Sequence, residues 1–239
     1  MLIAPLPRPL SPAPLSLGAT PYPEACEPLE EVSAAQPADA AAALGFGLAR
    51  LAKACARDRR PLALVTTAEW LRERGRPFAQ GCAGFGVAPQ RLVWIRAERE
   101  TEALWALEEA LKSGAVAAAL GCVETPSFVA TRRLDFAARA GAAAGLILKA
   151  RPASELSAAR RRWRISAQGS GEAIFDPLAP GMARLRAELT RRRDGPPAAW
   201  NLELDDETGG LRLVAGLAGH GMASRAVASL SASATERAA

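Results

Sequence analysis

The most constraining feature of this sequence is a series of short apolar runs between residues 61 and 150, separated by segments with helical periodicity. The runs are continuous rather than alternating, which is typical of strands buried on both faces of a parallel sheet. Strand–helix–strand units in series therefore predict an α/β protein with a mainly parallel sheet covered by helices. The expected strands are PLALVTT (61–67), RLVWI (91–95), AVAAALGCV (115–123) and GLILKA (145–150).

The segments between these runs are expected to be helices. In the clearest of them, residues 101–115, Leu104, Leu107 and Leu111 line one face and Gly114 is a plausible end. The other helices are expected at residues 37–57, 68–86 (with breaks near Gly75 and Gly81) and 131–144.

After Arg151 the period changes to two. In RRWRISA, Trp163 alternates with Arg162 and Arg164, and ARLRAEL alternates in the same way. AWNLEL and LRLVAG flank DDETGG, a good hairpin loop. These strands predict an antiparallel extension of the sheet, although Met182–Arg193 also fits a helical spacing.

Composition divides the chain into three parts. Eight of the 18 prolines fall within residues 1–28, which predicts an irregular N-terminal arm. Residues 29–217 carry the periodic pattern of one domain, and residues 218–239 form a tail rich in small residues. No apolar stretch suggests a membrane span and the N-terminus lacks the pattern of a secretory signal, so a cytoplasmic location is expected.

Several kinds of site are disfavoured. The four cysteines form no C-x-x-C pair, so neither a zinc site nor a disulfide framework is indicated. The single histidine, His220, lies in the Gly-rich tail, which argues against Ser-His-Asp and Cys-His catalysis. No cofactor or metal is expected.

Charge is distributed unevenly. Residues 1–48 carry one Arg and five acids (1 − 5 = −4), whereas residues 149–195 carry eleven Lys or Arg and five acids (11 − 5 = +6). A basic half suggests an acidic partner, either nucleic acid or protein. Trp163 is expected in the core, because alternation turns it away from its arginine neighbours. The candidate contacts to a partner or to phosphates are Arg160, Arg161, Arg162, Arg164, Arg191, Arg192 and Arg193.

The middle of the chain resembles RecA. Ala68-Glu69 follows LVTT, Gly86-Val87 precedes the second strand, and SGAV (113–116) precedes the third. The flanks sharpen the resemblance. With DAAAALGFGLARLA, TRRLDFAARAGAAAGLILKAR, RRWRISA and RRRDGPPAAWNLELDDETGGLRLVA, the sequence is similar to the ImuA family, the RecA-like accessory proteins of bacterial damage-induced mutagenesis cassettes, which also carry a SulA-like label. The resemblance implies a RecA-like three-layer core.

The phosphate-binding loop of that fold is missing. G-x-x-x-x-G-K-[ST] brings backbone N–H groups and a lysine to the phosphates. This sequence has no Gly-Lys dipeptide, and its lysines are Lys53, Lys112 and Lys149. On the RecA pattern the loop falls across Ala34–Ala41, with Ala40 near the place of the lysine. The sequence therefore predicts a core without a P-loop.

The metal side of the nucleotide site is missing as well. Gly121 or Cys122 stands where the resemblance places the acid that holds the metal ion. Glu69 matches the position of the water-activating residue, but as an acid at a helix N-terminus it also has a plain structural explanation. We expect a protein that does not hydrolyse ATP.

The resemblance also implies a function, that of a non-catalytic adaptor in SOS-induced, error-prone translesion DNA synthesis. Its partners would be an ImuB-type Y-family polymerase-like protein, an error-prone DNA polymerase subunit of the replicative class, and RecA. The short connection near residues 125–130 argues against a long DNA-binding loop. Two alternatives stay open: a SulA-like cell-division inhibitor, and an ATP-dependent recombination mediator with a degenerate nucleotide site.

Overall fold

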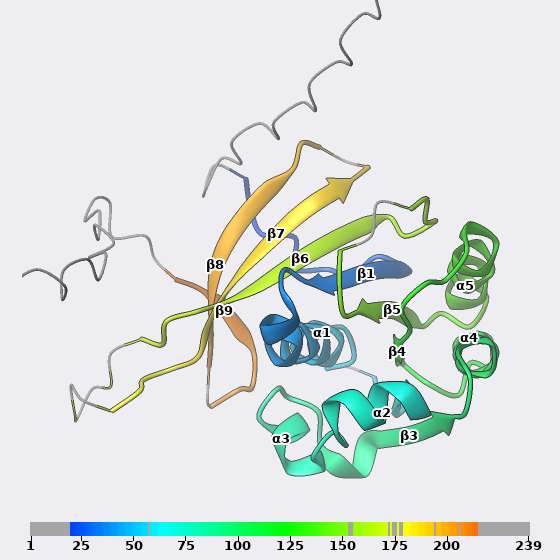
Figure 1. The fold of residues 1–239 in the computed structure, drawn as a ribbon, viewed down its shortest axis with the longest axis horizontal. Helices are drawn as coiled ribbons and strands as arrows, with labels where there is room; N and C mark the ends of the chain where they lie inside the picture. The colour runs from blue at the N-terminus through cyan, green and yellow to red at the C-terminus, as the bar shows by residue number, and fades with distance from the viewer. Residues whose placement is uncertain are drawn as a thin grey trace, which may run out of the picture.

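The centre of the molecule is one sheet, which contains nine strands in the described part of the chain, in the order β3-β2-β4-β5-β1-β6-β7-β8-β9 (Figure 1). This computed structural model describes residues 20–214 except positions 57, 153, 154, 172, 174, 175, 177, 178, 194 and 206. The strands are β1 (Leu29–Ala34), β2 (Leu62–Thr67), β3 (Leu92–Ala97), β4 (Ala118–Cys122), β5 (Ala144–Lys149), β6 (Arg161–Gln168), β7 (Arg184–Arg192), β8 (Ala198–Leu204) and β9 (Leu211–Leu213).

The sheet has a parallel part and an antiparallel part. From β3 to β6 all neighbouring strands are parallel, whereas β7, β8 and β9 each pair antiparallel with the preceding strand. A mainly parallel sheet with a C-terminal antiparallel extension is thus confirmed. The extension begins one strand later than the change of period suggests, because β6 lies parallel to β1 and antiparallel only to β7.

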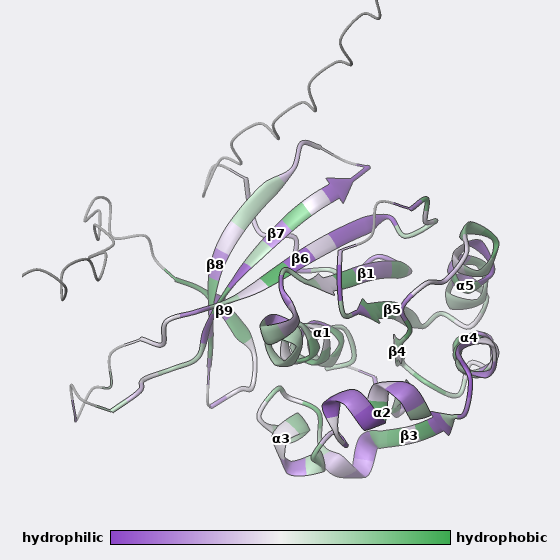
Figure 2. Ribbon diagram, in the orientation of Figure 1, coloured by the Kyte–Doolittle hydropathy of each residue, from purple (hydrophilic) through white to green (hydrophobic). Residues whose placement is uncertain are grey.

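Helices cover both faces of the parallel part. α1, α2 and α3 lie on one face with one hydrophobic cluster, and α4 and α5 lie on the other face with a second cluster (Figure 1). Figure 2 shows hydrophobic colour concentrated in the central strands and alternating colours along β6 and β7. The helical elements are η1 (Pro37–Asp39), α1 (Ala40–Ala54), α2 (Ala68–Arg74), α3 (Ala79–Ala83), η2 (Pro89–Arg91), α4 (Glu100–Lys112) and α5 (Phe128–Ala140).

Local sequence explains where the helices begin and end. The hydroxyl of Thr67 accepts a hydrogen bond from the N–H of Trp70 and begins α2, and Ser127 begins α5 in the same way. After α4, Gly114 adopts a φ of 67°, which favours glycine and ends the helix. The predicted break near Gly75 is confirmed, and the predicted break near Gly81 lies two residues later, because α3 includes Gly81 and ends at Ala83.

Two strands differ from what the sequence pattern alone indicates or leaves open, namely β7 and β1. Residues 184–192 form strand β7 with Leu185, Ala187 and Leu189 buried, so the helical alternative for this segment is wrong. β1 is not among the strands that the apolar runs predict, because Glu30 and Glu31 interrupt its pattern. It nevertheless lies at the centre of the sheet between β5 and β6, and every residue of it is buried.

Residues 20–28 contain no helix or strand, but they are not detached from the domain. The ring of Tyr22 lies 5.9 Å from that of Trp163 and 5.5 Å from that of Trp200, and Trp200 Nε1 donates to the carbonyl of Thr20 at 2.8 Å. This segment therefore covers the α1 side of β6 and β8. The rest of the predicted arm (1–19) and the predicted tail (218–239) lie outside the described residues.

Candidate functional site

The predicted arginine run is divided by β6 between the two faces of the sheet. Arg161 and Trp163 point toward α1, while Arg162 and Arg164 point to the opposite face. Trp163 is 1% exposed, which confirms that it belongs to the core. The run is therefore not one continuous surface, and each arginine has to be considered with its own surroundings.

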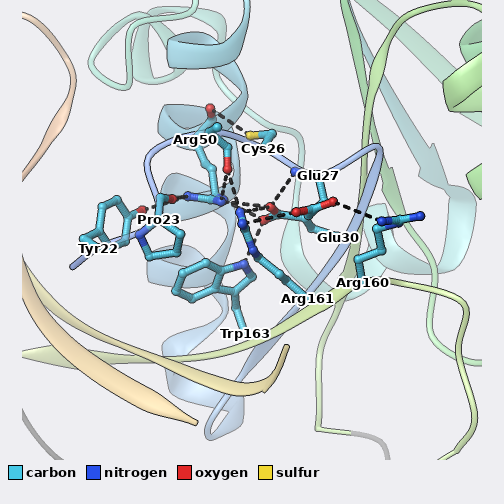
Figure 3. Close-up of polar contacts among 10 residues, drawn as sticks. Tyr22, Pro23, Cys26, Glu27, Glu30, Arg50, Arg160, Arg161 and Trp163 are labelled. Carbon is cyan, nitrogen blue, oxygen red and sulfur yellow. Dashed lines mark hydrogen bonds and ion pairs between the residues drawn. The ribbon is translucent and has the colours of Figure 1, made fainter. Parts of the chain in front are cut away.

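Arg161 is part of a buried polar network around the carboxylate of Glu30, shown in Figure 3. Glu30 accepts hydrogen bonds from Arg50 Nε at 2.6 Å and Nη2 at 2.8 Å. It also accepts from Trp163 Nε1 at 2.8 Å and from the backbone N–H of Glu27 at 2.9 Å. Arg161 Nη1 lies 3.3 Å from the same carboxylate. Arg161 thus satisfies an interior charge and is not available to a ligand.

Arg50 connects the same network to the N-terminal segment. It donates to the hydroxyl of Tyr22 and to the carbonyls of Pro23 and Ala25 at 3.2, 2.8 and 3.0 Å. Burial alone would lower the pKa of Arg50, but its hydrogen bonds and its charge interaction with a carboxylate raise that pKa above the usual value. Burial raises the pKa of the nearby Cys26 thiol to about 12, so this cysteine is protonated and unreactive at neutral pH. The network is structural.

Arg160 and Arg162 also have acidic partners within the chain. Arg160 lies 3.8 Å from Glu27. On the α5 side of β1, Arg162 lies 3.5 Å from Glu31, and Lys149 lies 2.7 Å from the same carboxylate. Lys149 is only 2% exposed, so this pair is a buried ion pair. Much of the basic charge before and within β6 therefore neutralises the acidic strand β1.

A more accessible group of arginines lies on the α5 side of the antiparallel strands. In Figure 1, β7 and β8 extend beyond the described helices, and the side chains of Arg164, Arg184 and Arg212 on this face are partly exposed. Its polar side chains come from four adjacent strands and carry a balance of 4 − 2 = +2. We call it the arginine face, and it consists of Arg164, Arg184, Arg186, Arg212, Glu188 and Glu203.

On the arginine face each glutamate lies between two arginines. Glu188 accepts from Arg164 Nε at 2.8 Å and from Arg186 Nε at 2.9 Å. Burial on its own raises the pKa of Glu188, but the two arginines outweigh it and hold that pKa below the usual range. The Arg164 side chain remains 44% exposed, so its charge still faces solvent.

The second set repeats this arrangement on β7, β8 and β9. Glu203 accepts from Arg184 Nε at 2.8 Å and from Arg212 Nη2 at 2.7 Å. The hydrogen bond from Arg184, with that from Arg212, lowers the pKa of Glu203 against a smaller effect of burial. Each set carries a net charge of +1 and holds its guanidinium groups in fixed positions. Such an arrangement suits carboxylates on a partner surface, since guanidinium forks pair with carboxylates in a planar geometry.

The remaining predicted residues lie at the end of β7. Arg191 and Arg193 are exposed, and Arg192 is half-buried. The contact role predicted for all seven arginines stays a prediction. Sequence reasoning missed Arg184, Arg186 and Arg212, although a signal was present: in ARLRAEL the residues that alternate with the buried ones are Arg184, Arg186 and Glu188.

The turn between β1 and α1 contains an internal anion. Asp39 Oδ2 accepts from the N–H of Gln36 at 3.1 Å, and Oδ1 accepts from the N–H of Ala167 at 2.9 Å. Asp39 immediately precedes the first residue of α1, where a helix offers its positive dipole end. The carboxylate makes no hydrogen bond to the first N–H groups of α1, but it places a negative charge directly before that helix and ties the turn to β6.

The carboxyl ends of β2 and β4 border an acidic cleft of about 420 Å³. Gly121 near the end of β4 has no room for a side chain, because a Cβ there would lie 2.5 Å from Cδ2 of the buried Leu107. Burial raises the pKa of the neighbouring Cys122 thiol, which is therefore neutral. The charged residues lining the cleft are five acids and two arginines: Glu69, Glu73, Glu98, Glu100, Glu124, Arg74 and Arg99.

The described part of the chain contains no group of three or more His, Cys, Asp or Glu side chains arranged to hold a metal ion. None of its helices combines the length and the hydropathy that a bilayer span requires.

The chain is thus an α/β protein with a mainly parallel sheet, a basic sheet face and an acidic cleft. No family model matches the chain. It is 36% identical over 167 residues to Protein ImuA from Caulobacter vibrioides strain NA1000 / CB15N, covering 64% of this chain and 68% of that protein. Protein ImuA from strain ATCC 19089 / CIP 103742 / CB 15 gives the same values. The chain belongs to the ImuA family. Among solved structures, SulA from Pseudomonas aeruginosa is 26% identical with a TM-score of 0.40, covering 51% of this chain and 97% of that one.

Proposed function

We propose that this chain is a cytoplasmic, non-catalytic adaptor with a RecA-like core that acts in SOS-induced, error-prone translesion DNA synthesis. Membership in the ImuA family is the observation that carries this proposal. The partners we propose are an ImuB-type Y-family polymerase-like protein, an error-prone replicative-class polymerase subunit, and RecA. The chain would act by docking these proteins rather than by chemistry.

The turn before α1 supports the absence of catalysis. In a P-loop the N-terminus of the helix receives a phosphate. Here the carboxylate of Asp39 stands directly before α1, held by the N–H groups of Gln36 and Ala167, so a phosphate approaching the helix would meet a negative charge. The space at Gly121 is filled by Leu107, which leaves no place for an acid that binds a metal ion. The cleft beside it carries 2 − 5 = −3, which disfavours a polyphosphate further.

The arginine face supports docking of a protein with an acidic surface. Its guanidinium groups are held on a sheet rather than on loops, so little rotamer freedom is lost when a carboxylate binds. None of the described residues of the arginine face is aromatic. The stacking platform typical of single-strand binding is therefore missing there. We therefore assign the face to a protein partner.

The function is tested by damage-induced mutagenesis in cells that lack this chain. We expect the mutation frequency after ultraviolet irradiation to fall, and wild-type chain to restore it. An Arg164→Glu/Arg186→Glu variant should restore it poorly, whereas Arg72→Glu, an exposed arginine on α2, should restore it fully. An unchanged mutation frequency together with filamentation on overexpression would refute the adaptor role and favour the division inhibitor.

Catalysis is tested separately with the purified chain. We expect no saturable ATP binding by calorimetry and no ATP turnover. Turnover that disappears in Glu69→Gln would show that the cleft is an active site and would overturn this part of the proposal.

A further inference from the structure

The outer surface of α4 and α5 carries a concentration of exposed apolar side chains. Of eight large apolar residues that are exposed in the described chain, four lie on these two helices. Trp105 on α4 is 63% exposed, and Val129 and Phe136 on α5 are 67% and 58% exposed. Phe128 at the start of α5 is the fourth. Clustered exposure of this kind marks an interaction surface, and tryptophan is the residue most enriched in binding hot spots.

The surface is hollowed between the two helices. A groove of about 320 Å³ is lined by Leu104 and Trp105 from α4 and by Ala130 and Leu134 from α5. Its walls belong to helices that pack on the sheet through buried residues, so the groove is part of the rigid scaffold. It can therefore receive apolar side chains without rearrangement of the backbone.

The two helices that form the groove carry opposite net charge, and the charged residues that line it are Glu108 and Arg133. α4 contains four Glu and one Lys (1 − 4 = −3), and α5 contains three Arg and one Asp (3 − 1 = +2). Glu108 and Arg133 form an ion pair of 2.7 Å between the walls. The guanidinium of Arg132 lies over the ring of Phe136, 5.7 Å from its centroid, where a partner carboxylate can reach it. A complementary partner is basic on the α4 side and acidic on the α5 side.

The size of the surface selects the kind of partner. Each helix has 13 residues, so at 1.5 Å per residue and a diameter of about 10 Å the pair presents roughly 20 by 20 Å, or about 400 Å². A stable dimer of globular proteins needs about 800 Å² from each partner. The surface is therefore too small for a second copy of this chain on its own, but it matches one helix laid in a groove.

We propose that the α4–α5 groove binds one amphipathic helix of a partner protein. The helix inserts apolar side chains against Leu104, Trp105, Ala130 and Leu134, places basic side chains along α4, and places acidic side chains near Arg132, beside the exposed ring of Phe136. This inference deepens the adaptor function, on which it rests for the expectation of a protein partner. The groove and the arginine face lie on different elements, so one chain can hold two partner segments at once.

The decisive experiment is site-specific photo-crosslinking in damage-treated cells. p-Benzoylphenylalanine is incorporated in place of Trp105 in the full chain. The control is the same probe in place of Phe78, which is 72% exposed in the segment before α3 on the other side of the sheet. Crosslinked peptides are then identified by mass spectrometry.

We expect position 105 to capture a peptide from another protein, with apolar residues at i, i+3, i+4 and i+7 and the stated charge pattern. Position 78 should not capture it. Capture of this chain itself, of a peptide without that pattern, equal capture at both positions, or no capture would each overturn the proposal. A matching peptide from a protein unrelated to replication or repair would uphold the groove and count against the adaptor function.

Affinity measurements with the captured protein complete the test. We expect Trp105→Ala and Phe136→Ala each to weaken binding at least about ten-fold, because buried aromatic anchors dominate such interfaces. Phe78→Ala should stay within about two-fold of the wild type. Equal binding by all three variants would refute the groove even if crosslinking had succeeded.

Discussion

Arg50→Met is expected to destabilise the chain strongly. Both partners of the Arg50–Glu30 pair have side chains that are 1% exposed, so the variant leaves a buried carboxylate with one cation fewer. It also removes three donors to Tyr22, Pro23 and Ala25. Breaking a buried pair costs about 3–5 kcal/mol. For a chain of this size the melting temperature should fall by about 6–20 °C, at about 2–4 °C per kcal/mol.

The assay is urea unfolding followed by tryptophan fluorescence, because Trp163 lies in the network. A double-mutant cycle with Glu30→Gln separates the pair from its surroundings. We expect a coupling energy of about 1–3 kcal/mol, since the double variant no longer buries a lone charge. Arg139→Met is the control, because that residue forms a more exposed ion pair within α5, and its loss should cost about 0.5 kcal/mol or less. If Arg50→Met cost under about 1 kcal/mol, or if the cycle were additive, the network would not stabilise the fold as argued.

Two further predictions concern packing and pH. A Cβ on Gly141 would lie against the carbonyl oxygen of Leu111, so Gly141→Ala should cost about 3 kcal/mol by urea unfolding, while Gly169→Ala, in open space, should cost about 0.5 or less. Equal costs would mean that α4 and α5 do not approach each other this closely. The pKa of Glu203 is lowered in the fold, so its stabilising effect is present above the ordinary glutamate value near 4.3 and is lost as the pH falls through the folded-state value. The stability difference between wild type and Glu203→Gln should therefore shrink from about pH 7 to pH 3, and a constant difference would contradict the role of Arg184.

The parts of the fold that could be predicted from the sequence are those with a local signal. The apolar runs at residues 61–67 and 145–150 are strands because continuous burial requires continuous apolar side chains. The alternation around Trp163 gave the face of each residue in β6. These signals need only neighbouring residues, and so they can be read without the structure.

β1 and the sharing of charge across the sheet could not be predicted in this way. The two acids of β1 make its sequence polar, yet Glu30 is satisfied by Arg50, 20 residues away, and by Trp163, 133 residues away. Glu31 forms an ion pair with Lys149 on the next strand and lies 3.5 Å from Arg162. Nothing near residues 29–34 indicates that these partners exist. A polar strand at the centre of a sheet becomes stable only when the whole fold assembles its counter-charges.

This assembly also changes the meaning of the charge asymmetry. The acidic first part and the basic later part of the sequence suggest an external acidic partner, but the chain places β1 between β5 and β6 and pairs Glu30 and Glu31 with their cations. Arg161 and Arg162 are used inside the fold by the same arrangement. The basic charge left for a partner therefore lies on Arg164 of β6 and on β7 to β9, where each carboxylate is shared by two arginines. Binding at the arginine face should accordingly depend on Arg164 and the β7 arginines Arg184 and Arg186, and not on Arg161 and Arg162, although these belong to the run that is most conspicuous in the sequence.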